Sequence, residues 1–177
     1  MAVLLTAEPA SRLVEAEAAA AILDVQIRCL GLRDGGLWEQ ADLVPRLRRC
    51  MDEFRPDRIY THWPLDAHPD HQACGMATFR AWLQLSGSDI PRLFCYEVVL
   101  GNQTTAFSPT HYVNVTEFTE PKKRALFCHA SQRPDETFYP THEAMMKLRG
   151  LECGCETAEA FVEVFRRPVH ARERYMF

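Results

Sequence analysis

The sequence has neither an excess of basic charge nor a long hydrophobic run. Its 177 residues carry 20 Lys and Arg against 24 Asp and Glu, which gives a formal net charge of −4. A protein that binds chiefly to phosphate backbones needs a cationic surface, so nucleic acid is not expected as a partner. No apolar run reaches the roughly 18 residues of a membrane span, and the opening Met-Ala-Val-Leu-Leu-Thr lacks the charge and length of a signal peptide. We therefore expect a cytoplasmic protein with no membrane partner.

Two further signatures are missing. The seven cysteines are odd in number and scattered, which fits a reducing compartment better than a disulfide framework. Neither Gly-x-Gly-x-x-Gly nor Gly-x-x-x-x-Gly-Lys occurs, so the sequence does not indicate a nucleotide-binding α/β domain. With 47% hydrophobic and 25% charged residues and no linker, residues 1–177 are expected to form one globular domain.

Hydrophobic periodicity predicts alternating strands and helices. We expect strands at 2–5, 25–30, 58–62, 93–100 and 111–115, and helices at 13–23, 43–54, from Pro69 onward, 116–129, 142–149 and 157–165. The run at 93–100 is almost continuously apolar, which is typical of a strand covered on both faces. The alternation favours an α/β domain with a mostly parallel sheet. Residues 101–109 are expected to form a loop at the rim of a cleft.

The segment Asp66-Ala67-His68-Pro69-Asp70-His71 places two imidazoles and two carboxylates at a predicted strand-to-helix junction. Ligands bind at such junctions in open α/β sheets. With Pro69 in the first helical turn, His68 and His71 lie three residues apart and can face the same way. Neutral imidazole binds metal, and Asp66 or Asp70 could accept the remaining ring proton and fix the tautomer.

The same spacing also has a simpler interpretation. His-x-x-His at the start of a helix is often a polar cap, and carboxylates are common on solvated helix ends. Two ligands do not make a zinc site, because catalytic zinc usually has three protein ligands and a water molecule. Metal binding and a purely structural role both remain open on spacing alone.

An ordered set of short motifs along nearly the whole chain carries a family resemblance. The set comprises Arg12 with Glu15, Leu30-Gly31-Leu32 with Asp34-Gly35, Arg55-Pro56-Asp57, the segment from Asp66 to His71 with Ala73 and Gly75, His129-Ala130-Ser131-Gln132, and Arg149-Gly150 with Ala158-Glu159-Ala160-Phe161. In these motifs the chain resembles the LmbE-like, or PIG-L-like, zinc-dependent de-N-acetylases, which act on N-acetylglucosamine-type substrates. The resemblance implies a three-layer, Rossmann-like fold.

The resemblance also implies roles for individual residues. By this resemblance, His71 matches a zinc ligand of the family. His68 matches the histidine that stabilises the oxyanion and protonates the leaving amine, and Asp70 matches the carboxylate that orients that histidine. Arg12 resembles an arginine on the substrate side of the cleft. Asp34 and Asp66 complete the candidate substrate-binding set, although Asp34 also suits the Asp-Gly turn for backbone reasons, and Arg12 with Glu15 also fits a plain intrahelical pair.

One family signature is absent. The family's His-Pro-Asp-Asp motif, which supplies two zinc ligands and the general base, does not occur here, and Met1 to Thr6 aligns with the family's second strand. We therefore expect a domain that is N-terminally incomplete, with weak or no zinc binding unless the missing ligands are supplied. A missing central strand would leave backbone donors and an apolar stripe uncovered, to be filled by another copy of the chain or by a longer form of the protein.

Two functions follow as hypotheses. The first is a zinc-dependent hydrolase that removes the acetyl group from an N-acetylglucosamine-type amino sugar or sugar conjugate. The second is a sugar-binding remnant without hydrolytic activity. A homo-oligomer is also possible from the sequence, since tryptophans are common interface anchors as well as core residues: Trp38, Trp63 and Trp82.

Overall fold

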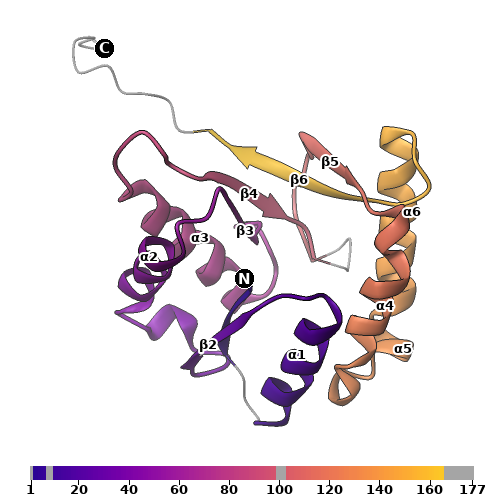
Figure 1. Ribbon diagram of the computed structural model, residues 1–177, viewed down its shortest axis with the longest axis horizontal. Helices are drawn as coiled ribbons and strands as arrows, with labels where there is room; N and C mark the ends of the chain where they lie inside the picture. The colour runs from indigo at the N-terminus through magenta and orange to yellow at the C-terminus, as the bar shows by residue number, and fades with distance from the viewer. Residues whose placement is uncertain (1, 7–9, 99–102, 166–177) are drawn as a thin grey trace.

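The computed structural model describes residues 2–6, 10–98 and 103–165, and its strands and helices alternate through the first hundred residues (Figure 1). The elements are β1 (Ala2–Thr6), α1 (Ser11–Ile22), β2 (Ile27–Leu32), η1 (Leu37–Glu39), α2 (Leu43–Phe54), β3 (Arg58–His62), α3 (Pro69–Leu83), β4 (Arg92–Tyr96), β5 (His111–Asn114), η2 (Thr116–Phe118), α4 (Thr119–Phe127), η3 (Ala130–Gln132), α5 (Pro134–Thr137), α6 (Tyr139–Cys153) and β6 (Ala158–Val164). The α/β fold predicted from the sequence is confirmed. No helix in the described ranges is both long enough and apolar enough to cross a bilayer.

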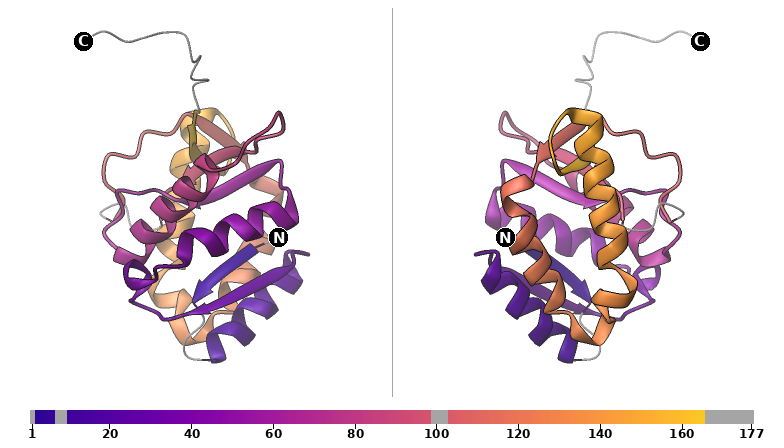
Figure 2. Two further views of the ribbon diagram at one scale, coloured as in Figure 1. Left: turned by 90° about the vertical axis from the view of Figure 1, so that its left-hand side faces the viewer. Right: turned by 90° about the vertical axis from the view of Figure 1, so that its right-hand side faces the viewer.

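The strands lie between two layers of helices. Helices α2 and α3 cover one face, and α1, α4 and α6 cover the other, as the two side views show (Figure 2). The main core forms where α2 and α3 meet the sheet, with Leu47 from α2, Ala81 and Trp82 from α3, and Leu93 from β4 buried together. Leu93 is fully buried, which agrees with the expectation of a strand covered on both faces.

The strands form two separate sheets. The first pairs β1 with β2 in parallel, and the second has the order β3-β4-β6-β5, with β3 and β4 parallel. A cavity of about 550 Å³ separates the two, lined by Ala2 and Val3 of β1, by residues of β3 from Arg58 to His62, and by side chains of α2 and α3. The parallel strands β3 and β4 carry the junction that the sequence singles out.

The helix expected at residues 157–165 is wrong. That segment is strand β6, which pairs antiparallel with both β4 and β5. Its residues Ala158, Ala160 and Phe161 are buried between the two neighbours. Tertiary pairing in the middle of a sheet therefore outweighs the helical propensity of Ala and Glu in this sequence.

Other differences concern element ends. The strand expected at 93–100 ends at Tyr96, and residues 99 and 100 lie outside the described residues. The helix expected at 116–129 begins with the short η2 turn, and α4 follows from Thr119 to Phe127. The strand at 58–62 and the helix at 43–54 have the bounds that the sequence predicts.

Candidate active site

The start of α3 is built as the sequence predicts. Pro69 occupies the first helical turn, where its missing N–H costs nothing, and His68 is the N-cap. The backbone N–H of Asp70 donates to Nδ1 of His68 at 3.2 Å. Because Nδ1 accepts this bond, a neutral His68 ring carries its proton on Nε2. The exposed His68 ring therefore presents an N–H donor to solvent.

The carboxylate of Asp70 holds a loop rather than the His68 ring. It is buried and accepts the backbone N–H groups of Gly35 at 2.7 Å and Leu37 at 3.1 Å. These bonds anchor the loop between β2 and α2 to the start of α3. The expected contact of Asp70 with His68 is made by its backbone N–H, so the carboxylate contributes to the shape of the site and not directly to the orientation of the ring.

Asp66 organises the junction from inside. Its Oδ1 accepts the backbone N–H of His68 at 2.7 Å and lies 3.2 Å from Nδ1 of His71. A carboxylate can only accept, so a bond from His71 puts the ring proton on Nδ1 and leaves the lone pair on Nε2. Asp66 is 2% exposed, and this burial places it behind the histidines rather than on a substrate-facing surface.

The loop after β4 contributes an unexpected side chain. Nε2 of Gln103 donates to Oδ1 of Asp66 at 3.0 Å and lies 3.2 Å from Nδ1 of His71. The backbone N–H of Ala67 also donates to the carbonyl of Gln103, at 2.7 Å. The part of the predicted rim that the structure describes, residues 103–109, is thus tied to the junction, while residues 101 and 102 lie outside the described residues.

Three imidazole rings stack in a row. The ring centroid of His71 lies 4.5 Å from that of His68 and 4.3 Å from that of His62, with interplanar angles of 23° and 21°. His62 ends β3, and its ring nitrogens lie 3.2 and 3.3 Å from the Tyr96 hydroxyl. Burial, together with the neighbouring His71, lowers the pKa of His62 to about 4, so this ring is neutral at pH 7.

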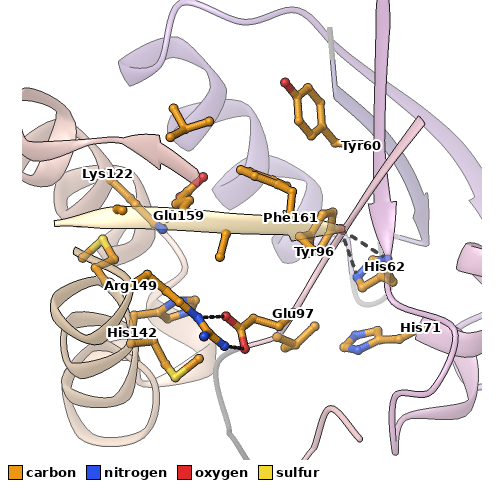
Figure 3. A pocket seen from close by; sticks show the side chains of 16 residues that line it. Tyr60, His62, His71, Tyr96, Glu97, Lys122, His142, Arg149, Glu159 and Phe161 are labelled. Carbon is orange, nitrogen blue, oxygen red and sulfur yellow. Dashed lines mark hydrogen bonds and ion pairs between the residues drawn. The ribbon is translucent and has the colours of Figure 1, made fainter. Parts of the chain in front are cut away.

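A cavity of about 570 Å³ opens beside this stack (Figure 3). The sheet forms the floor of the cavity. Tyr96 pairs with His62 on one neighbouring strand and with Phe161 on the other, and paired residues point to the same face of a sheet, so these three side chains lie in a row on that face. His62 and His71 line one end, which we call the histidine end. The other end is lined by Glu97, Lys122, His142, Arg149 and Glu159, and we call it the ion-pair end.

The ion-pair end contains two opposed pairs of charges. Nε and Nη2 of Arg149 each donate to Glu97 at 2.7 Å, and Lys122 pairs with Glu159. Glu97, followed by Glu152 on the same helix as Arg149, raises the pKa of the Arg149 guanidinium. Burial and the nearby Lys122 lower the pKa of His142 to about 4, so the His142 ring is neutral at pH 7.

Arg12 and Asp34 meet each other away from the cavity. Nη1 of Arg12 lies 3.2 Å from Oδ2 of Asp34, and both side chains are about 40% exposed. The neighbouring Glu15 accepts the backbone N–H of Ser131 at 2.8 Å and its hydroxyl at 2.7 Å, and these bonds lower the pKa of Glu15. Neither Arg12 nor Asp34 lines the cavity, although the Asp34 loop is joined to α3 through Asp70.

The described residues supply part of a zinc site and do not complete one. His71 is backed by the carboxylate of Asp66, and Oδ2 of Asp66 is buried with no hydrogen-bond partner among the described atoms. Within residues 2–6, 10–98 and 103–165, however, no three His, Cys, Asp or Glu side chains form a group that could hold a metal. Catalytic zinc usually has three protein ligands, so these residues fit the ion only in part.

A glycine sets the distance between α3 and the end of β3. A Cβ atom at Gly75 would lie 2.5 Å from the carbonyl oxygen of His62, which is closer than real Cβ contacts. The absence of a side chain lets the first turns of α3 pack directly on the strand end. That approach brings His71 into contact with His62.

Two contributors to the site were not predicted from the sequence. Gln103 lies in a loop without a recognisable motif, and His62 has the pattern of an ordinary partly buried histidine. A signal for His62 is its place as the last residue of the strand that leads into the junction, where ligand-binding residues gather in α/β folds. No comparable signal exists for Gln103, because its role depends on the folding back of residues 103–105 onto residues 65–67.

The fold and the junction together define a three-layer α/β protein whose polar site lies at the carboxyl ends of parallel strands. Residues 6–82 match the family model PIG-L, described as GlcNAc-PI de-N-acetylase. A probable N-acetyl-α-D-glucosaminyl L-malate deacetylase 2 of Bacillus subtilis (strain 168) is 31% identical over 109 residues, which is 60% of this chain and 49% of that protein. The resemblance to the PIG-L-like family is confirmed. The chain spans about half the length of the curated relatives it matches.

Solved structures support the same fold over almost the whole chain. A conserved protein of Thermus thermophilus superposes with a TM-score of 0.78 and 26% identity, covering 97% of this chain and 84% of that one. The N,N'-diacetylchitobiose deacetylase of Pyrococcus horikoshii has a TM-score of 0.74 at 23% identity, over 88% and 63% of the two chains. A 4-carboxy-2-hydroxymuconate hydratase from Pseudomonas putida also matches, with a TM-score of 0.79 at 19% identity over 97% and 86%. The shared fold therefore accommodates more than one chemistry.

Proposed function

We propose that this chain acts as an amide hydrolase that removes the acetyl group from an N-acetylglucosamine-type amino sugar or sugar conjugate. The observation that carries the proposal is the junction itself, where His68 presents an exposed Nε2–H beside His71, and Asp66 holds both residues from behind. The match to the de-N-acetylase family model over residues 6–82 supports the same reaction class.

His68 is the proposed acid of the reaction. An amide resists hydrolysis because its nitrogen is a poor leaving group until it is protonated, and a positioned imidazole can supply that proton. A neutral ring that gave up its Nε2 proton would become an imidazolate, so His68 first takes up a proton on Nδ1, in place of the hydrogen bond from the Asp70 N–H. The resulting imidazolium then delivers its Nε2 proton to the leaving amine and returns to the neutral ring. The same Nε2–H can stabilise the negative charge that develops on the acetyl oxygen.

His71 is the proposed metal-facing residue. The contact of Nδ1 with Asp66 directs the Nε2 lone pair outward, which is the arrangement in which histidines bind zinc. We propose that zinc binding by this chain is weak, because one histidine falls short of the three protein ligands of catalytic sites. Arg12 and Asp34 are the proposed substrate contacts, while Asp66, being buried, is proposed to position the two histidines.

Acetate release tests the proposal directly. The purified chain is incubated with N-acetylglucosamine or its L-malate conjugate, with and without added zinc, and acetate is quantified. We expect zinc-dependent release that His68→Gln reduces by about 10²–10⁴-fold, the contribution typical of a general acid. The matched control is His111→Gln, since His111 lies on β5 beside Glu163 and does not line the cavity.

Two results would contradict the proposal. Equal loss of activity in the two histidine variants would remove the assignment of His68. Binding of the sugar without acetate release at any zinc concentration would favour a sugar-binding module instead of a hydrolase.

A further inference from the structure

The ion-pair end of the cavity has no role in the hydrolysis proposed above. It lies across the cavity from His71 and is built from the chain after β4 and from α4, α6 and β6, all distant in sequence from the histidine junction (Figure 3). Packing alone does not require a row of charged groups to border a cavity. The chemistry of these groups indicates which ligand they suit.

The charges that line this end are balanced. Arg149 and Lys122 supply two positive charges, and Glu97 and Glu159 supply two negative charges. The Arg149 and Glu97 side chains are 12% and 14% exposed and form two parallel hydrogen bonds, so neither group is readily released to a ligand. An anionic ligand would meet two carboxylates and no uncompensated cation among these lining groups. Burial of an unpaired anion there would be strongly unfavourable.

His142 adds a neutral polar group to the same wall. With its pKa lowered to about 4, the ring is uncharged at pH 7 and offers one N–H donor and one nitrogen acceptor. Carboxylate oxygens accept hydrogen bonds and the cationic groups donate them, so the wall as a whole presents donors and acceptors side by side. A hydroxyl group both donates and accepts, and it satisfies such a surface without bringing a charge.

Apolar side chains also line the cavity. Phe161 lies on the floor with its ring centroid 5.1 Å from that of Tyr60, and Met145 and Met146 come from α6, the helix that also carries His142 and Arg149. Cavities that bind small molecules combine such apolar surface with a few polar groups that fix orientation. A sugar ring matches this combination because it has an apolar face and a polar rim.

We propose that the ion-pair end binds a second, uncharged and hydroxyl-rich unit of the substrate, such as a neutral sugar linked to the acetylated one. The inference rests on the proposed function, since the acetamide of the first unit would lie against His68 and His71. By this inference the substrate is a neutral glycoside rather than a conjugate with malate or phosphate.

Binding measurements without turnover test this inference. Isothermal titration of the full chain compares N-acetylglucosamine, N,N'-diacetylchitobiose as a neutral disaccharide, and N-acetylglucosaminyl L-malate as an anionic conjugate. We expect the disaccharide to bind about ten-fold more tightly than either other probe, which corresponds to one or two additional hydrogen bonds. His142→Ala is expected to remove the advantage of the disaccharide over the monosaccharide, whereas His111→Ala keeps it.

A second variant keeps the test valid if His142→Ala does not fold. Met145→Trp places a bulky ring on α6 between His142 and Arg149 and should also abolish the preference for the disaccharide. A thermal melt confirms that each variant folds. Tighter binding of the malate conjugate, equal affinity for mono- and disaccharide, or a preference that survives both variants would overturn the inference.

The outcome is separable from that of the proposed function. Selective binding of the disaccharide without acetate release would support the second binding unit and contradict the hydrolase. Acetate release without any preference among the three probes would support the hydrolase and contradict the second binding unit.

Discussion

The two ends of the cavity are built in different ways. The histidine end comes from one strand–helix junction, in which residues 62–71 supply three stacked imidazoles and the carboxylate behind them. The ion-pair end draws its side chains from four separate parts of the chain, and its charges cancel in pairs. A local junction holds groups close enough for chemistry, whereas a dispersed set of balanced charges shapes a surface and fixes orientation.

The largest expected effect is at the histidine end. His71→Ala removes the proposed metal-facing nitrogen, and any zinc bound by the purified chain should be lost. Zinc content at neutral pH, measured by elemental analysis after dialysis, checks this, with Arg149→Lys at the ion-pair end as the comparison. Zinc retained in His71→Ala would mean that the ligand lies elsewhere.

At the ion-pair end the expected effect is on stability. Arg149→Met leaves the largely buried Glu97 without its cation and should lower the free energy of unfolding by about 2–4 kcal/mol, somewhat less than for a fully buried pair. Arg149→Lys keeps the charge but loses the second parallel hydrogen bond, so its loss should be smaller. Urea unfolding of both variants gives the two values, and an unchanged midpoint for Arg149→Met would show that the pair adds nothing.

Gly75→Ala probes the packing behind the histidine end. The new methyl group would clash with the His62 carbonyl, and the resulting shift should cost about 1–3 kcal/mol. A chain of this size should then melt roughly 2–4 °C lower for each kcal/mol lost. Met76→Ala, at a partly exposed position in the same helix, is the control. A melting temperature within error of the wild type would show that α3 can move away from β3 freely.

The pH dependence of the free energy of unfolding tests whether His142, the neutral group at the ion-pair end, is partly buried as the structure shows. The pKa of His142 is about 4 in the folded chain and about 6.5 when unfolded, so between these values the unfolded chain binds more protons. The free energy of unfolding should therefore fall as the pH drops from about 6.5 to about 4. The slope of this free energy against pH is proportional to the number of protons taken up on unfolding, and His142→Gln should lower that number by up to about one. Denaturant unfolding at several pH values measures the slope. The same slope in both proteins would place the His142 ring in contact with water.

The smallest effect is expected outside the cavity. The exposed Arg12–Asp34 pair should contribute less than about 1 kcal/mol, so Arg12→Met should hardly change the melting temperature. If Arg12 contacts substrate as proposed, the same variant should raise the KM for acetate release without a matching loss of stability. A large drop in stability with an unchanged KM would reverse this assignment.

The sequence predicts the histidine end much better than the ion-pair end, for a physical reason. Pro69, His68 and Asp70 act through local geometry at a helix start, so their arrangement follows from adjacent residues. Glu97 and Arg149 meet only because β4 and α6 pack near each other, and no local rule gives that contact. The wrong assignment at 157–165 has the same origin, since β6 forms its hydrogen bonds with strands more than 40 residues away.

The Asp70 carboxylate shows a second limit of prediction from sequence motifs. Asp70 lies in the first turn of α3, yet the partners of its carboxylate are the backbone N–H groups of Gly35 and Leu37, more than 30 residues earlier in the chain. A motif identifies which side chains gather at a site. The direction in which each one points depends on loops that arrive from elsewhere.

The cavity between β1 and β3 has a consequence for behaviour at high concentration. Each of these strands pairs on one side alone within the described part of the chain, so their facing edges carry rows of backbone N–H and C=O groups that no strand engages there. Such edges act as templates for intermolecular β-pairing. The molecule thus carries, in its centre rather than at its rim, strand edges of the kind that promote self-association in concentrated solution.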